Sequence, residues 1–312
     1  MHVLGIDAGG TKTVCLLADE HGAILSVGRG PGANLQVAGE LEVEKVLHHV
    51  METALDGRHH LRPDAVCLGI AGVDRDDDSR IVSAIMRRIS PGTRVLVVND
   101  ALVALEAGAP GSPGIVIICG TGSIAYGRNV HGLAARSGGW GHIIGDEGSG
   151  YWIGRRAVQA VMRDADGRGP TTSLSQQVLA HFDVPVASSL VHIVYGPRSA
   201  NRSMAMLGPS VQLASESGDE VASAILDGAA GELALAARSV AERLRLRTDS
   251  FPFVLAGGVF RVVPSLVDRL RPRLIEIAPG ATIDILREEP ARGAVRLALA
   301  EARGGALIPK YT

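Results

Sequence analysis

An internal repeat is the sequence feature that most constrains what this chain can fold into. When the segment beginning near residue 114 is shifted by 110 positions onto the N-terminus, both copies read as an apolar strand, a Gly-Thr turn, a second strand, a His-Gly turn and a third strand. Such a match in register predicts two related lobes, each opening with a glycine-rich hairpin. The matching positions are Gly10 and Gly120, Thr11 and Thr121, Thr13 and Ser123, His21-Gly22 and His131-Gly132, and Gly28 and Gly138.

The rest of the chain alternates strands and helices, which favours mixed sheets covered by helices. After residue 148 the pattern becomes mainly helical. We expect strands at 3–7, 13–18, 23–28, 65–71, 94–98, 251–257 and 281–286, and helices at 39–56, 77–89, 148–164, 172–182, 186–194, 202–216, 219–245, 263–271 and 290–303.

Composition excludes several classes of protein. With 312 residues, 46% of them hydrophobic, the chain is long enough for about two domains with buried cores. A net charge of −2 argues against a nucleic-acid binder with a broad basic face. The sequence has neither a signal peptide nor an apolar run of about 18 residues, so we expect a cytoplasmic protein with no membrane partner. The cysteines Cys15, Cys67 and Cys119 lie in apolar runs and are expected to be reduced core residues.

The first glycine loop, 5–13, resembles a P-loop but fails the test for one. A P-loop has Lys directly after its second Gly and then a helix, whereas here Thr11 intervenes and a strand follows. The alternative is a hairpin that turns backbone amides toward phosphate, with Asp7 facing Mg²⁺ or its waters. A tight turn that binds nothing is the competing interpretation, and the second loop at 119–123 shifts the balance toward nucleotide binding.

Other segments have both a functional and a structural interpretation. Gly257-Gly258 either lets adenosine approach the backbone or simply packs a strand on a helix. Asp100 either performs catalysis or caps the helix that follows it. The segment 137–150 is so rich in glycine that we expect a functional loop. The pairs His48-His49 and His59-His60 have no metal-ligand spacing and are expected to be solvated.

Together these motifs resemble, in order and spacing, the N-acetylglucosamine kinase branch of the BadF/BadG/BcrA/BcrD ATPase family, within the sugar kinase, Hsp70 and actin superfamily. The segment GGWGHIIGDEGSGYW at 138–152 is the most specific part. The resemblance implies an α/β fold of two ribonuclease-H-like lobes, the actin-like ATPase fold, with a nucleotide cleft between them. The expected lobes are 1–110 plus 290–312, which carries the first phosphate loop, sugar and base residues, and 111–289, which carries the second phosphate loop and the adenosine loop.

The resemblance also implies roles for individual residues. Asp100 matches the catalytic base and also contacts the sugar, and Asp7 is the expected Mg²⁺ residue, directly or through water. The expected sugar-binding residues are Asn34, Asp100, Gly139, Trp140 and Asp146. The expected ATP-binding residues are Asp7, Gly9, Gly10, Thr11, Lys12, Thr13, Gly120, Thr121, Gly122, Ser123, Gly257 and Gly258.

The implied activity is ATP- and Mg²⁺-dependent phosphorylation of the 6-hydroxyl of an amino sugar, with N-acetylglucosamine as first choice and glucosamine or N-acetylmuramic acid as alternatives. The expected partners are then a small sugar and ATP, and a homodimer is the oligomeric state considered. A rival of another class is an ATPase that activates a dehydratase or reductase through a shared iron–sulfur cluster. No cysteine pair in the sequence suggests the ligands of such a cluster.

Overall fold

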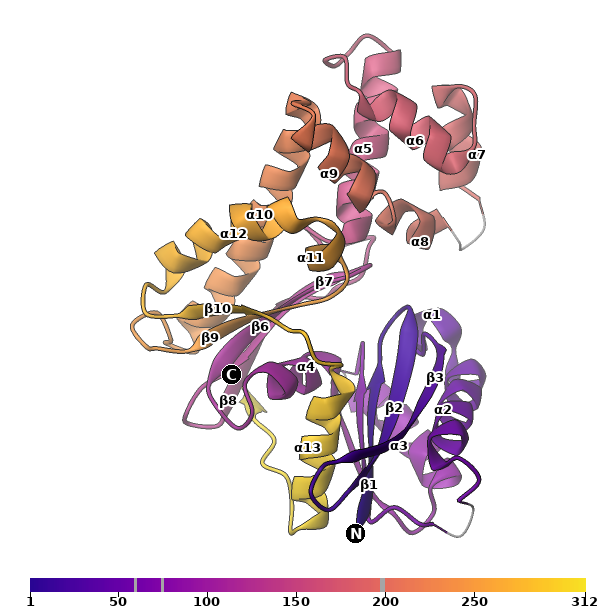
Figure 1. The fold of residues 1–312 in the computed structure, drawn as a ribbon, viewed down its shortest axis with the longest axis vertical. Helices are drawn as coiled ribbons and strands as arrows, with labels where there is room; N and C mark the ends of the chain where they lie inside the picture. Colours follow the sequence, from indigo (N-terminus) through magenta and orange to yellow (C-terminus); the bar gives the residue numbers. More distant parts are fainter. Residues whose placement is uncertain (59–60, 74–75, 197–199) are drawn as a thin grey trace. The chain divides into compact units, whose positions relative to one another are not determined.

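The computed structural model describes residues 1–58, 61–73, 76–196 and 200–312; His59 and His60 lie outside this range. The chain divides into two compact units (Figure 1). Unit 1 contains residues 1–116, 126–134 and 286–312, and unit 2 contains residues 117–125 and 135–285. The lobe boundaries inferred from the sequence stay a prediction.

The first sheet contains the expected N-terminal meander. Its strand order is β3-β2-β1-β4-β5, with β1, β2 and β3 antiparallel and β1, β4 and β5 parallel. Because β1, β4 and β5 run the same way, their carboxyl ends lie at one edge, where Asp7 of β1 is in register with Gly69 of β4. The strands are β1 (His2–Ala8), β2 (Lys12–Asp19), β3 (Ile24–Pro31), β4 (Ala65–Ile70) and β5 (Arg94–Asn99).

The second sheet repeats the strand order of the first. Its order is β10-β9-β6-β7-β8-β11, so that, without β11, β8-β7-β6-β9-β10 matches β3-β2-β1-β4-β5 strand for strand. The duplicated strand pattern expected from the sequence is therefore confirmed. The strands are β6 (Gly114–Cys119), β7 (Ser123–Arg128), β8 (Leu133–Gly138), β9 (Pro252–Ala256), β10 (Thr282–Ile285) and the unexpected β11 (Lys310–Tyr311).

The turn between the second and third strands is the same in both copies. The Asp19 carboxylate accepts hydrogen bonds from the amides of His21 and Ala23, both at 2.9 Å. The Asn129 side-chain oxygen accepts from the amides of His131 and Leu133, at 3.0 and 3.1 Å. Gly22 and Gly132 both adopt positive φ, at 81° and 72°, a region that glycine enters without steric cost.

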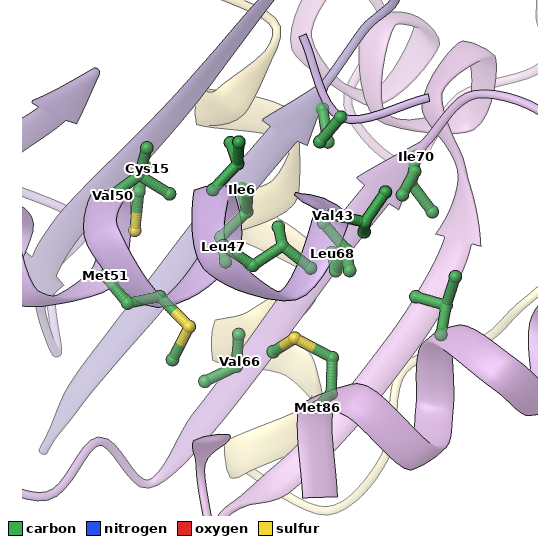
Figure 2. Packing of buried hydrophobic residues seen from close by; sticks show 14 of the residues in the cluster. Ile6, Cys15, Val43, Leu47, Val50, Met51, Val66, Leu68, Ile70 and Met86 are labelled. Carbon is green, nitrogen blue, oxygen red and sulfur yellow. The ribbon is translucent and has the colours of Figure 1, made fainter. Parts of the chain in front are cut away.

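One face of the first sheet is covered by α2 (Glu40–Leu55) and α3 (Asp76–Ile89). Figure 2 shows Val43, Leu47 and Met51 of α2 packed against strand side chains such as Ile6 and Leu68. Side chains at alternate strand positions point to the same face, and the apolar positions of both helices recur at helical spacing. This is the core of unit 1.

The other face of the sheet is covered by α13 (Ala291–Ala302) and α4 (Asp100–Gly108). A Cβ on Gly5 would lie 2.8 Å from the Ala291 carbonyl oxygen, and one on Gly69 would clash with Val103 of α4. Glycine at these two strand positions lets both helices approach the sheet backbone. The last helix thus packs on the first strand.

Unit 2 holds most of the remaining helices, and two of the expected helices differ from the structure. The expected helix 202–216 is broken, since Pro209 has no amide hydrogen to bond the Ala205 carbonyl oxygen. The expected end at 271 is wrong because α12 continues through Pro272, with Leu274 and Ile277 buried. The other helices of the chain are the unexpected α1 (Leu35–Ala38), then α5 (Gly150–Ala165), α6 (Leu174–Phe182), the 3₁₀ turn η1 (Ala187–Ser189), α7 (Leu190–Val194), α8 (Ala200–Ala205), α9 (Gly208–Glu216), α10 (Glu220–Arg243), α11 (Val259–Val262) and α12 (Pro264–Ile277).

Within the described residues, no single helix has the length and apolar character needed to cross a membrane. The bent pair formed by α6 and by Ala187–Val194 meets those criteria only when its two members are taken together.

Candidate functional site

The first glycine loop joins β1 to β2 in unit 1. The Gly9 amide donates to the Lys12 carbonyl at 3.0 Å and closes the turn. Gly10 is exposed, and a Cβ placed on it would meet nothing within 4 Å. Thr13 is buried, and its hydroxyl donates to the Pro31 carbonyl at 2.7 Å. The open side of this loop is therefore formed by the residues before Thr13.

The segment that carries Asn34 packs on this glycine loop. The Ala33 amide donates to the Gly9 carbonyl at 3.1 Å, and a Cβ on Gly32 would lie 2.8 Å from the Thr11 nitrogen. Glycine at position 32 is thus required for two loop backbones to touch. Asn34 follows Ala33 directly and precedes α1, which begins at Leu35. The contact between Ala33 and Gly9 therefore places Asn34 beside the first glycine loop.

Asp7 and Asp100 lie at neighbouring strand ends. Gly69 is in register with Asp7 on one side, and a Cβ on Gly69 would lie 3.4 Å from the Asp100 Cα on the other. Burial, followed by the nearby Asp100 carboxylate, raises the pKa of Asp7 from 3.8 to about 7, although the Lys12 charge opposes the shift. A second cation placed beside Asp7 would therefore be favourable.

The structure separates the two interpretations of Asp100. Asn99 is the N-cap of α4, and its side-chain oxygen accepts a hydrogen bond from the Ala101 amide at 2.8 Å. Asp100 is the first residue of the helix, where the helix dipole also stabilises a carboxylate. Capping of α4 is thus performed by Asn99 and does not account for an aspartate at position 100.

The sequence analysis missed Glu289. Its carboxylate lies 2.9 Å from Lys12 Nζ and 3.1 Å from Arg29 Nη1. Burial raises the pKa of Glu289, but its hydrogen bonds with Lys12 and Arg29 outweigh burial and hold the pKa below its usual value. Glu289 is 277 residues from Lys12, so no local pattern reveals this pairing.

The second glycine loop, in unit 2, is bonded to the start of α5. The amides of Gly150 and Tyr151 donate to the carbonyls of Gly120 and Thr121, at 2.9 and 3.3 Å. Ser149 is the N-cap of α5 and accepts from the Trp152 amide at 3.1 Å. The Ser123 hydroxyl donates to the Glu147 carbonyl at 2.7 Å. The loop 137–150 and the second phosphate loop therefore form one structure.

Asp146 reaches this loop from the glycine-rich segment. A Cβ on Gly122 would lie 2.7 Å from Asp146 Oδ2, and the Ser123 amide points to Oδ1 at 3.4 Å. Burial raises the pKa of Asp146, and the amides of Ser123 and Gly141 partly offset the shift. Asp146 also has a φ of 58°, a left-handed conformation that is uncommon outside glycine but that aspartate adopts more often than most residues.

Trp140 lies in the same segment, and its side chain is half exposed. The Arg136 guanidinium lies over one face of the indole, with Cζ 4.2 Å from the ring centroid. The Gly139 amide donates to the Ser123 carbonyl at 2.9 Å, which ties the base of this segment to β7. Gly139, Trp140 and Asp146 are thus brought together around the second loop.

The third glycine turn also lies beside the second loop. Gly257 has a φ of 111°, and a Cβ on it would clash with the Cys119 carbonyl. Gly258 follows, and a Cβ there would meet nothing within 4 Å. The predicted adenosine turn and second phosphate loop of unit 2 are therefore neighbours, and the close backbone contact alone requires glycine at position 257.

In unit 1, Asp7 with the neighbouring Asp100 carboxylate is the pair of oxygen ligands that we consider for a metal ion. In the described ranges, no group of three or more His, Cys, Asp or Glu residues has the arrangement of a metal cage. Mg²⁺ typically uses one or two carboxylates, waters and the phosphates of its nucleotide. Asp7, with its raised pKa and carboxylate neighbours, fits such a site.

Comparison with known proteins extends these observations. The model of the BadF/BadG/BcrA/BcrD ATPase family matches residues 4–298. An N-acetylmuramic acid/N-acetylglucosamine kinase of Clostridium acetobutylicum is 37% identical over 96% of this chain and 99% of its own length. An N-acetyl-D-glucosamine kinase of Dictyostelium discoideum is 35% identical over 95% of this chain and 97% of its own.

Among solved structures, a provisionally named N-acetylglucosamine kinase from Chromobacterium violaceum superposes with a TM-score of 0.73 and 26% identity. The match covers 96% of this chain and 98% of the other. The family resemblance and the α/β fold with two related sheets, as expected from the sequence, are thereby confirmed.

Proposed function

The chain belongs to the BadF/BadG/BcrA/BcrD ATPase family, and on that premise we propose that it transfers the γ-phosphoryl group of ATP to the 6-hydroxyl of an amino sugar, N-acetylglucosamine. The observation that carries the proposal is the position of Asp100. It lies at a strand end beside Asp7, and Asn99 has taken over the capping of α4. Glucosamine and N-acetylmuramic acid are the alternative substrates.

Phosphoryl transfer depends on positioning and on charge neutralisation more than on covalent chemistry. In unit 1, we assign the phosphates to the backbone of Gly9, Gly10 and Thr11, with Lys12 adding a positive charge. In unit 2, we assign them to the backbone of Gly120–Ser123, with adenosine at Gly257-Gly258. The open space beside Gly10 and Gly258 supports these assignments, because a ligand can approach the backbone there.

Asp100 is assigned as the base that orients the sugar hydroxyl and accepts its proton as the bond to phosphorus forms. Asn34 and Asp146 are assigned to sugar hydroxyls, with Gly139 contacting the sugar through its backbone and Trp140 packing on an apolar face of the pyranose. Asp7 would hold Mg²⁺, directly or through water, and the ion would neutralise charge on the phosphates when bound.

The burial of the cysteines argues against the rival role as an activator with an iron–sulfur cluster. Cys15, Cys67 and Cys119 are free and fully buried, and burial raises the pKa of each thiol. Cluster ligands are thiolates and must reach the cluster at a shared surface. Buried, reduced thiols also support our proposal of a cytoplasmic location.

A substrate panel tests the proposed function. The purified chain is supplied with ATP and Mg²⁺ and with N-acetylglucosamine, glucosamine, N-acetylmuramic acid or glucose, and ADP release and the phosphorylated sugar are both measured. We expect the highest kcat/KM for N-acetylglucosamine and a 6-phosphate product. A higher value for glucosamine would change the substrate, and ADP release without sugar phosphate would contradict the kinase assignment.

A further inference from the structure

We propose that Arg136 is a positioning residue for the sugar site, which holds the Trp140 ring in the orientation that sugar binding needs. The proposal rests on the proposed function, because it takes Trp140 to be the ring on which the sugar packs. Arg136 belongs to neither glycine loop and lies outside the segment 137–150 that the sequence singles out. Its role therefore follows from its contacts in unit 2.

Arg136 makes two contacts with the segment that follows it. Its guanidinium carbon lies 4.2 Å from the centroid of the Trp140 ring, well within the range of a cation–π interaction. The Nη1 group of the same guanidinium donates to the Gly138 carbonyl at 2.8 Å. One side chain therefore fixes both the ring and the backbone two residues before it.

The Arg136 backbone is itself held in place. Arg136 belongs to β8, and its carbonyl accepts a hydrogen bond from Arg243 Nη1, at the end of α10, at 2.9 Å. The guanidinium thus extends from a strand that is paired in a sheet and fastened to a helix. A rigid element of this kind is a suitable base for orienting a ring in a loop.

The backbone around Trp140 gives the ring little support of its own. Gly138, Gly139 and Gly141 all have positive φ, at 78°, 73° and 85°, and glycine restricts the chain less than any other residue. The indole side chain is 56% exposed. A half-exposed ring between such residues would sample several rotamers, and ordering it on binding would cost affinity. The stacked guanidinium limits those rotamers beforehand.

The stacking also determines which side of the indole is available. Arg136 covers one face of Trp140, so a sugar can pack only on the opposite face. Loss of the guanidinium is expected to weaken sugar binding without touching the reacting atoms. This predicts a change in KM for the sugar with little change in kcat.

The chain contains a matched control. Its only other tryptophan, Trp152, is half-buried beside Gly228 of α10, and the exposed Arg156 of α5 lies over its ring at 4.9 Å. Arg136→Met and Arg156→Met therefore remove the same kind of interaction from two different rings. Only Trp140 is assigned to the sugar site, so only the first substitution should alter sugar kinetics.

The experiment uses the full chain with Trp152→Phe as the parent, so that Trp140 is the sole fluorophore. We expect Arg136→Met to lower the steady-state anisotropy of Trp140, to increase its quenching by acrylamide and to raise KM for N-acetylglucosamine about fivefold. The KM for ATP and kcat should stay within about twofold. Arg136→Lys, which keeps the charge, should restore part of both effects. Arg156→Met, measured with Trp152 present, should leave the kinetics unchanged.

Each other outcome has a defined meaning. An unchanged sugar KM in Arg136→Met, or unchanged anisotropy, overturns the role of Arg136 if Trp140→Ala raises that KM. An unchanged sugar KM in Trp140→Ala instead overturns the assignment of Trp140 in the proposed function, and the role of Arg136 with it. Should Arg136→Met fail to fold, Arg136→Gln, which also lacks the charge, supplies the same two measurements, and an unchanged sugar KM there overturns the role of Arg136.

Discussion

The two copies of the repeat have the same backbone hairpin but differ in which residues place carboxylates beside the glycine loop. In unit 1 a carboxylate stands on the first strand itself, as Asp7, and a second, Asp100, follows the fifth strand. The position 110 residues after Asp7 is the apolar Ile117, and β10, the counterpart of β5, is followed directly by Leu286 where β5 is followed by Asp100. The carboxylate of unit 2, Asp146, arrives from a separate glycine-rich segment.

This difference teaches that the two copies share a scaffold, whereas the residues with proposed chemical roles are particular to each copy. Both copies have the same strand order and the same turn, which is held by Asp19 in the first copy and by Asn129 in the second. Both features satisfy backbone hydrogen bonds. The acidic groups are not shared between the copies, in keeping with the different roles proposed for the two loops. Substitutions at matching scaffold positions should therefore have similar effects on the two copies, whereas substitutions of charged residues should affect stability or kinetics differently in each copy.

The largest expected effect is on kcat, and it comes from substitution of Asp100. Asp100→Asn should lower kcat by about 10³-fold, because a positioned base contributes about that much, while the KM for ATP stays within about twofold. Steady-state kinetics with N-acetylglucosamine measure both. Asp77→Asn, which removes an exposed carboxylate from the first turn of α3, is the matched control and should keep full activity. Turnover of Asp100→Asn close to the parent value would remove Asp100 as the base.

The next effect concerns the glycine that lets α13 approach the first sheet. Gly5→Ala should lower the free energy of unfolding by about 3 kcal/mol, since its Cβ would press on the Val295 and Ala291 backbone. The position 110 residues later is Ile115, which is fully buried, so this constraint belongs to the first copy of the repeat alone. Chemical denaturation measures the change.

The control is Gly231→Ala, in the middle of α10, where a Cβ would meet nothing within 4 Å. It should stabilise the protein by up to about 1 kcal/mol, because alanine favours the helix more than glycine. Equal destabilisation by both substitutions would show that the close contact at Gly5 is not the cause.

Substitution of Asp7 should change the free energy of unfolding by an amount that depends on pH. Its pKa of 3.8 in the unfolded chain rises to about 7 in the native state, so its contribution to stability is complete below pH 3.8 and is lost as the pH rises through 7. Asp7→Asn should therefore raise the free energy of unfolding by about 2 kcal/mol at pH 8, after allowance for partial solvent access, and leave it unchanged near pH 4.

Denaturation curves for Asp7→Asn without nucleotide at both pH values measure this. The corresponding change in unit 2, Asp146→Asn, should stabilise less, because the amides of Ser123 and Gly141 already hold its charge. A destabilised Asp7→Asn protein at pH 8 would contradict a raised native pKa.

Gly10 and Gly120 occupy the same place in the two copies, and a Cβ on either meets no atom closer than 4.0 Å. Alanine at either position should leave the free energy of unfolding within about 0.5 kcal/mol. It should raise the KM for ATP about fivefold, because the methyl group would occupy the space assigned to phosphate. Thermal unfolding and steady-state kinetics separate the two effects. A change in only one of the two variants would assign phosphate binding to that loop.

The smallest effect tests the shared turn. Asp19→Asn gives the first copy the residue of the second, and the side-chain oxygen can still accept from the His21 and Ala23 amides. We expect the Tm to change by no more than about 1 °C. Asp19→Ala, which removes both hydrogen bonds, should lower the Tm more. Equal Tm values for the two variants would show that the turn does not need its acceptor.

Local patterns were enough to predict the strands and most helices, since apolar periodicity and glycine turns determine both sheets. The sequence left Asp100 with two interpretations, because a first-turn aspartate and an N-cap look alike. Only the hydrogen bond from Ala101 to Asn99 showed which residue caps α4. The helix expected at 263–271 was too short, because α12 continues through Pro272, where the buried apolar face beyond the proline outweighs one lost hydrogen bond.

The candidate site was predictable where residues are adjacent and unpredictable where they meet through the fold. Glu289 pairs with Lys12 across the length of the chain, and two adjacent glutamates before a helix give no signal of that pairing. Arg136 reaches Trp140 across two glycines, Gly138 and Gly139, that both take positive φ. Conformations of this kind depend on the assembled structure, not on the residue type alone.

The return of residues 286–312 to unit 1 has a consequence for biosynthesis. Unit 2 ends at Ile285, so all of its residues have been synthesised before the segment that contains α13 is made. Until then, α4 alone covers the face of the first sheet that α13 also covers in the finished protein, and that face, which carries the buried Val3 and Ala65, lacks its second helix. A nascent chain therefore carries an incomplete N-terminal unit for nearly the whole of its translation, and this apolar face is where a holding chaperone would bind.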